Sequence, residues 1–159
     1  MATMNSIPYE QLTIGDRARY HKTLTGQDVL LFAHTSGDRN PVHLDEAYAR
    51  TTPFKGRIAH GMWSAGLISA ALATVLPGPG SIYLGQTLRF LRPVRIGDRL
   101  TVELEVTGKQ DEKRRVTLAC RVLNQDGKVV VEGEAEVIPP PKAAEVEVPE
   151  LPGIHIGDG

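Results

Sequence analysis

The stretch Met62-Trp-Ser-Ala-Gly-Leu-Ile-Ser-Ala-Ala-Leu-Ala-Thr-Val-Leu76 carries only three polar side chains, those of Ser64, Ser69 and Thr74. A helix that is apolar nearly all round is normally buried on most sides. The run Pro77-Gly-Pro-Gly80 follows directly and cannot continue a helix. We therefore predict a buried helix over residues 62–76, which the other elements must cover.

The second half of the chain supplies that cover. Apolar and polar residues alternate over 99–107, 115–122 and 129–138, whereas 82–92 is mixed. The pair Asp126-Gly127 between two of these segments is a strong hairpin signal. Alternating strands joined by hairpins indicate an antiparallel sheet with one face in water. The predicted fold class is α+β, with the sheet wrapped around the helix.

The first half contains shorter elements. Residues 1–16 read as an irregular lead-in, and 17–24 alternate loosely enough to predict a strand. Thr25, with Asp28 three residues later, is a helix-start signal, and Gly37 is a natural helix terminator. One or two helical turns are predicted over 44–50, followed by a loop over 51–57. The predicted domain is 1–138, and the Pro-rich acidic tail 139–159 is predicted to be an extended arm.

Composition narrows the possible functions. The chain has 159 residues, which suits one domain with one core. A net charge of −1 gives no broad electrostatic reason to bind nucleic acid or an anionic membrane. The only cysteine, Cys120, excludes an intrachain disulfide and a multi-cysteine zinc site. We see no secretory signal, and the apolar run 67–76 is too short to span a bilayer. The expectation is a soluble cytoplasmic protein.

Two titratable residues lie close together in Ser36-Gly-Asp-Arg-Asn-Pro-Val-His43. Pro41 has no N–H and restricts Asn40 to extended geometry, so one continuous helix cannot carry both Asp38 and His43. A bent loop can aim a carboxylate and an imidazole at one water molecule. Acid and base groups positioned in this way are each worth about 10²–10⁴ in rate. The alternative is that Asp38 is an ordinary turn residue and His43 a partly buried histidine.

The start of the apolar helix offers a second kind of group. Gly61 lies where the backbone N–H groups of a first helical turn are unpaired, so it can face an oxygen that gains charge during a reaction. Close helix packing explains this glycine equally well. Ser69, inside the apolar run, either bonds back to its own helix or reaches the Asp38 carboxylate or a substrate. A metal site of Asp38, His43 and Asp45, with His60 as a fourth ligand, is disfavoured because no further Cys or His completes the shell.

These segments resemble a known family. Ser36-Gly-Asp-Arg-Asn-Pro-Val-His43, with Ala49 six residues beyond the histidine, is similar to the signature of the (R)-specific enoyl-CoA hydratases, or MaoC-like dehydratases. Ala59-His-Gly-Met62 and Pro93-Val-Arg-Ile-Gly-Asp98 resemble the same family, and the similarity runs from about residue 9 to 137. The resemblance implies a hot-dog fold, in which a curved antiparallel sheet wraps a long central helix. It also implies a homodimer that binds acyl-CoA in a tunnel near the interface. The Pro-rich tail lies outside the family pattern.

The resemblance further implies a reaction and its residues. Water would add reversibly to a trans-2-enoyl-CoA to give an (R)-3-hydroxyacyl-CoA, with no metal or other cofactor. Asp38 and His43 would be the catalytic pair, and the Gly61 N–H would hold the thioester oxygen. The residues expected to support the loop or lie at the substrate are Asn40, His60, Met62 and Ser69. The alternatives are a dehydratase acting on acyl carrier protein, a hot-dog thioesterase and a non-catalytic acyl-CoA-binding domain. The pathway, whether fatty-acid breakdown or polyhydroxyalkanoate synthesis, is left open.

Overall fold

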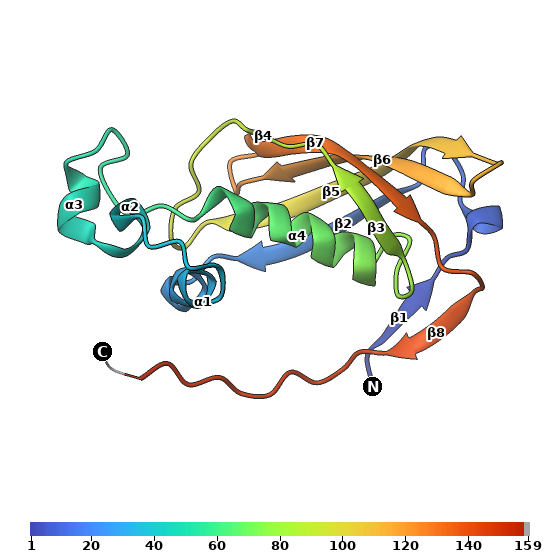
Figure 1. Ribbon diagram of the computed structural model, residues 1–159, viewed down its shortest axis with the longest axis horizontal. Coiled ribbons are helices and arrows are strands. Elements are labelled where there is room, and N and C mark those ends of the chain that lie inside the picture. The colour runs from blue at the N-terminus through green and yellow to red at the C-terminus, as the bar shows by residue number, and fades with distance from the viewer. Residues whose placement is uncertain (158–159) are drawn as a thin grey trace.

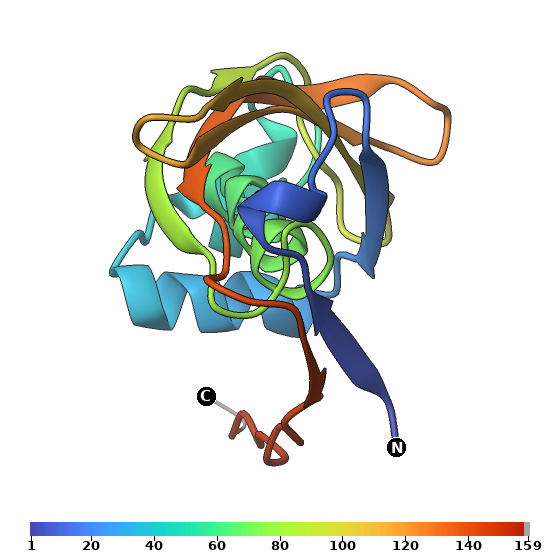
Figure 2. The same cartoon turned by 90° about the vertical axis from the view of Figure 1, so that its right-hand side faces the viewer.

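A curved antiparallel sheet forms the main body of the protein. The computed structural model describes residues 1–157. The six-stranded sheet has the order β2-β5-β6-β7-β3, and β4 pairs with β7 beside β3. Its strands are β2 (Arg17–Thr23), β3 (Ile82–Gln86), β4 (Arg89–Phe90), β5 (Arg99–Gln110), β6 (Arg115–Leu123) and β7 (Val129–Ile138). The sheet curves around one helix, as Figure 2 shows in end view. The predicted α+β architecture is confirmed.

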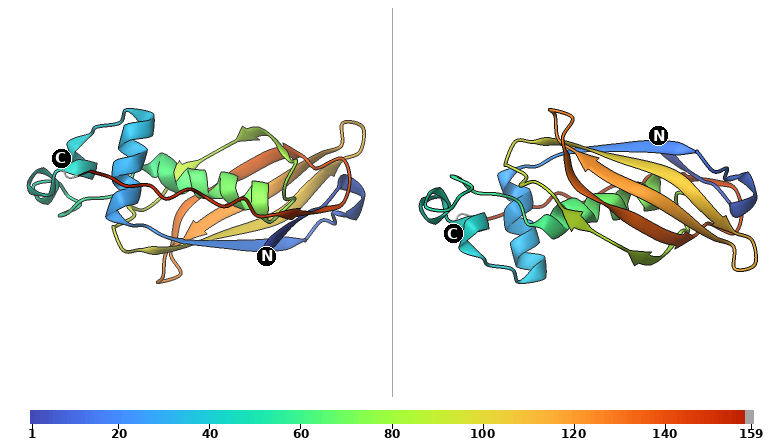
Figure 3. Two further views of the ribbon diagram at one scale, coloured as in Figure 1. Left: turned by 90° about the horizontal axis from the view of Figure 1, so that it is seen from below. Right: turned by 90° about the horizontal axis from the view of Figure 1, so that it is seen from above.

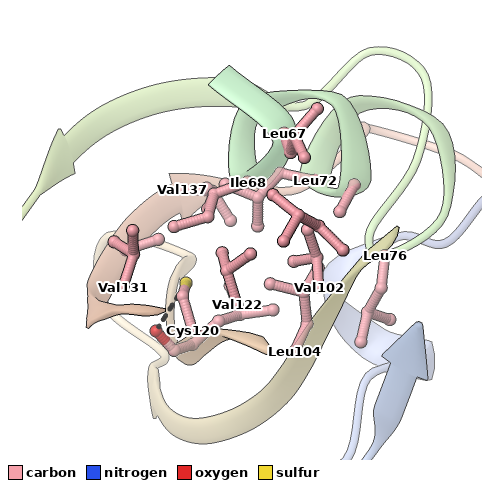
Figure 4. Packing of buried hydrophobic residues seen from close by; sticks show 14 of the residues in the cluster. Leu67, Ile68, Leu72, Leu76, Val102, Leu104, Cys120, Val122, Val131 and Val137 are labelled. Atoms are coloured by element: carbon pink, nitrogen blue, oxygen red, sulfur yellow. Dashed lines mark hydrogen bonds between the residues drawn. The ribbon is translucent and has the colours of Figure 1, made fainter. Parts of the chain in front are cut away.

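The helix inside the sheet is α4 (Gly61–Thr74). Its inward residues meet the alternating strand residues in the core, where Ile68 and Leu72 point towards Val102, Val122 and Val137 (Figure 4). Six of its fourteen residues are buried and four are half-buried, so the prediction of a helix buried on most sides holds, although one face is open. Its outer face is exposed at Gly61, Met62, Gly66 and Ala73. Small and apolar residues occupy both faces, so the sequence pattern does not reveal which face lies against the sheet.

Three further helices lie at one end of the body (Figure 1). α1 (Gly26–Ser36) begins with a capping box, in which Thr25 and Asp28 bond each other's backbone N–H groups, as the sequence predicts. It crosses beneath α4 (Figure 2). α2 (Pro41–Leu44) and α3 (Glu46–Arg50) follow as two short turns. These helices place the Asp38 loop beside the first residue of α4.

The two ends of the chain pair with each other outside the main sheet. β1 (Thr3–Ser6) pairs antiparallel with β8 (Ala144–Glu147), with Thr3 opposite Glu147. The irregular lead-in predicted for 1–16 is therefore wrong at β1, and also at a 3₁₀ turn (Tyr9–Gln11). Beyond β8 the chain runs back along the side of α4 that the sheet leaves open (Figures 1 and 3). β7 ends at Ile138, where the tail was predicted to begin, and residues 158–159 of that tail lie outside the described part.

Gly133 in β7 allows the segment between β3 and β4 to pack closely against this strand. A Cβ on Gly133 would lie 1.8 Å from the Thr87 carbonyl oxygen, so no larger residue fits while the backbone stays in place. The Thr87 N–H donates to the Glu134 carbonyl at 2.9 Å, and the Thr87 hydroxyl accepts from the Glu134 N–H at 3.0 Å. This close crossing fixes the segment between β3 and β4. β4 in turn brings Phe90 over the start of α4.

Candidate active site

Asp38 lies on a short loop that its own sequence shapes. α1 ends at Ser36, and Gly37 adopts the left-handed conformation with φ of 81°, as expected for a helix terminator. Asp38 is exposed, and one carboxylate oxygen accepts the Asn40 N–H at 3.0 Å. The Asn40 side chain accepts the Val42 N–H at 3.2 Å and so caps α2, whose first residue is Pro41. Asn40 therefore supports the loop, and its predicted contact with substrate stays a prediction.

His43 is buried in α2, with 7% of its surface exposed. Its Nδ1 lies 2.8 Å from the Ile58 carbonyl oxygen, which only accepts hydrogen bonds, so Nδ1 carries the proton. The other ring nitrogen, Nε2, is then left with its lone pair. Burial lowers the pKa of His43, and the Ile58 hydrogen bond opposes this effect only in part. His43 is thus a neutral imidazole with a fixed tautomer at neutral pH, which is the form that a general base requires.

The structure brings the predicted acid and base together. A carboxylate oxygen of Asp38 and one ring nitrogen each of His43 and His60 lie within 4.8 Å of one another. Two groups at that separation can both bond one water, since each hydrogen bond spans about 2.7–3.0 Å. The rings of His43 and His60 are stacked at 27°. Three of the four residues of the metal site that the sequence disfavours, Asp38, His43 and His60, thus lie together, and the absence of a metal stays a prediction. Asp45 lies elsewhere and caps α3.

A hollow of about 460 Å³ opens beside His43, and Asp38 is not among its lining residues. His43, Gly61 and Ser64 contribute to its wall, and the other lining residues are largely apolar: Phe54, Ile58, Ala59, Met62, Phe90, Leu91, Arg92, Pro93, Val94 and Val131. Gly61 is the first residue of α4, where N–H groups have no partner within the helix. A Cβ at Gly61 would lie 2.8 Å from the Phe90 ring, so the glycine also allows this close approach. Both explanations of Gly61 from sequence, a donor site and close packing, are compatible with this geometry.

The three remaining residues predicted to lie at the substrate differ in where they lie relative to the catalytic hollow. Met62 lines the catalytic hollow, and it also lines a second one of about 440 Å³ between α4 and β3. Ser69 lies in that second hollow. Within residues 1–157 no hydrogen bond joins Ser69 to Asp38, because Ser69 lies two turns further along α4. His60 is 2% exposed and is not among the residues that line either hollow.

Two groups of the candidate active site were not singled out from the sequence. Ser64 is almost fully buried and lines the catalytic hollow one turn after Gly61. A serine at that spacing in an apolar helix was a usable signal. The Ile58 carbonyl, which sets the His43 tautomer, had no signal because it is a backbone group brought near by the fold.

The lowered pKa of His43 predicts how stability depends on pH. The unfolded chain protonates its histidine near the ordinary value of about 6.5, before the folded chain does. We therefore expect the free energy of unfolding to fall as the pH drops from that value through the lowered pKa of folded His43. Urea unfolding of the wild type and of His43→Gln at several pH values would measure this dependence of the free energy of unfolding on pH. The stability of the wild type relative to the variant should decrease in acid, and parallel curves would contradict the prediction.

Comparison with known proteins identifies the family of the chain. Residues 12–127 match the family described as MaoC like domain. The chain belongs to the MaoC-like family. An (R)-specific enoyl-CoA hydratase of Rhodospirillum rubrum is 53% identical over 134 residues, covering 83% of this chain and 91% of that protein.

Two solved structures extend the likeness to the fold. The R-hydratase PhaJ1 from Pseudomonas aeruginosa has a TM-score of 0.93 and 58% identity, covering 98% of this MaoC-like chain and all of that one. An (R)-hydratase from A. caviae involved in PHA biosynthesis has a TM-score of 0.80 and 46% identity, covering 82% of this chain and 99% of that one. The predicted hot-dog fold is therefore confirmed. Among residues 1–157, no helix is both long and apolar enough to cross a membrane.

Proposed function

We propose that the protein is an (R)-specific enoyl-CoA hydratase, which adds water reversibly to a trans-2-enoyl-CoA to give an (R)-3-hydroxyacyl-CoA. The observation that carries this proposal is the approach of the Asp38 carboxylate to the buried, neutral ring of His43, beside a hollow that the first residue of α4 lines. The activity named for the R. rubrum relative supports it. The largely apolar wall of the hollow suits an acyl chain.

In the proposed reaction Asp38 and His43 share one water. Nε2 of His43 takes a proton from it as the water oxygen bonds to C3 of the substrate. The electron pair of the C2–C3 double bond moves towards the thioester carbonyl. Asp38 and His43 then return the proton to C2 on the same face. The thioester oxygen gains negative charge on the way. The Gly61 N–H can donate to that oxygen, and a single donor of this kind is typically worth about 10²–10³ in rate.

We also propose that a second copy of the chain covers exposed apolar surfaces of this one. The outer face of α4 leaves Met62 55% exposed, and β3 lies at the edge of the sheet with Ile82, Tyr83 and Leu84 exposed. Covering these apolar residues favours a homodimer. We further propose that the (R)-hydroxyacyl product supplies polyhydroxyalkanoate synthesis, because the similar A. caviae hydratase is involved in PHA biosynthesis. The cytoplasmic location stays a prediction.

Incubation with crotonyl-CoA tests the proposed function. The enoyl absorbance should fall until equilibrium is reached, and chiral analysis of the product should give the (R)-3-hydroxy enantiomer. Parallel assays with the same acyl group on acyl carrier protein distinguish this activity from that of a dehydratase that acts on acyl carrier protein. A flat enoyl absorbance with release of free thiol would instead indicate a thioesterase, and no change in either would indicate a binding domain. Sedimentation of the same sample should give about twice the 17.3 kDa chain mass.

A further inference from the structure

His60 connects the elements that carry the acid and the base. It is the residue before α4, it is 2% exposed, and its side chain does not cap that helix. Its ring lies between two others. The His43 ring on α2 stacks on it with centroids 3.9 Å apart, and the Phe32 ring of α1 lies at 4.8 Å with a 46° tilt. Three helices therefore meet at this one imidazole.

One hydrogen bond runs from His60 to the Asp38 loop. His60 Nε2 lies 3.1 Å from the backbone carbonyl oxygen of Asp38, and a carbonyl only accepts, so Nε2 carries the proton. Nδ1 is then a bare lone pair. It is buried and has no partner among the described residues. His60 therefore directs its Nε2–H at the backbone of the Asp38 loop.

The Asp38 loop has few other restraints. In the described part of the chain, the Asp38 N–H donates to the Ser36 hydroxyl, and Asp38 oxygens accept from the Asn40 N–H and from His60 Nε2. Asn40 belongs to the same loop, and Ser36 is the last residue of α1, so neither of these two bonds reaches α4. His60 is 22 residues away and immediately precedes α4. Its bond ties this exposed loop to the start of the central helix.

We propose that His60 is a positioning residue, which holds the Asp38 loop and the His43 ring at a fixed separation so that both can bond one water. This inference rests on the proposed function and replaces the substrate contact expected for His60 from the sequence. Burial is the largest cause of the lowered pKa of His43, and the charge interaction with His60 acts in the same direction. The simpler alternative is that His60 only fills space between α1 and α4.

Two variants separate the hydrogen bond from the packing. His60→Phe keeps a ring between Phe32 and His43 but loses the donor to Asp38. His60→Gln keeps an amide N–H donor but loses the ring. If His60 positions the pair, His60→Phe should lower kcat for crotonyl-CoA hydration by up to about 10²-fold, since small displacements of catalytic groups cost that much. KM should hardly change, because His60 does not line the hollow, and His60→Gln should recover part of kcat.

Hydrogen exchange at the loop gives a result that does not depend on activity. The Asn40 and His43 amides should exchange about tenfold faster or more in His60→Phe, and near the wild-type rate in His60→Gln, since local opening controls exchange. The matched control is His34→Phe, because His34 is an exposed histidine of α1. Wild-type exchange in His60→Phe, or equal loss in both His60 variants, would overturn the proposal. Absence of hydration by the wild type would instead refute the proposed function, while the exchange rates still decide the role of His60.

Discussion

Replacing His43 with glutamine should lower kcat for crotonyl-CoA hydration by about 10²–10⁴-fold, the usual worth of a positioned general base. Glutamine can still donate a hydrogen bond to the Ile58 carbonyl, so the local fold should persist. It cannot take a proton from water at any working pH. Asp38→Asn should reduce kcat by a similar factor, because an amide can bond the shared water but cannot exchange a proton with it. Initial rates at saturating substrate would measure both losses.

The matched control is His34→Gln, which changes an exposed histidine on α1 away from the catalytic hollow. This variant should keep the wild-type kcat. Circular dichroism of all three variants would show that the fold is retained. Full activity in either Asp38→Asn or His43→Gln would exclude the shared-water pair. A loss in His43→Gln alone would leave a single general base.

Ile68→Ala should lower the free energy of unfolding by about 2–5 kcal/mol, the range seen when a buried branched side chain is cut to alanine. Ile68 is 0% exposed and lies where the inward face of α4 meets the strands (Figure 4). The loss combines the lost burial with a cavity that the rigid sheet cannot fill. Urea unfolding, followed through the fluorescence of Trp63, would give the value, because Trp63 is the only tryptophan.

Leu151→Ala is the control for that measurement. It removes the same kind of side chain from the tail, where Leu151 is 91% exposed, and should change stability by no more than about 0.5 kcal/mol. A loss below about 1 kcal/mol in Ile68→Ala would mean that α4 is not the centre of the core, since a buried isoleucine is worth more than that.

The sequence predicted the strands of the main sheet well, since alternation reports directly which face is buried. The strand expected over 99–107 is observed as β5 (Arg99–Gln110), and that over 115–122 as β6 (Arg115–Leu123). β1 and β8 were missed for a physical reason. Both are short, neither lies on the core, and their pairing joins residues at opposite ends of the chain. No local pattern reports a pairing of that kind.

The candidate site was predictable where its geometry is local. Gly37 and Pro41 set the bend between Asp38 and His43 through backbone rules that any sequence obeys. The position of His60 was not predictable. Its burial and its stacking depend on how α1, α2 and α4 come together, and a histidine before a glycine looks the same in an exposed turn. The exposed face of α4 was missed for a similar reason, since glycine and alanine suit either environment.

The groups that carry the proposed chemistry come from one continuous piece of chain. Asp38, His43, His60 and Gly61 lie between the end of α1 and the start of α4, and no strand of the sheet supplies any of them. The sheet instead contributes wall residues such as Phe90 and Val131. The same segment also contributes Phe54, Ile58 and Ala59 to that wall. A substitution in a strand can therefore reshape one side of the hollow without changing the segment that carries Asp38 and His43.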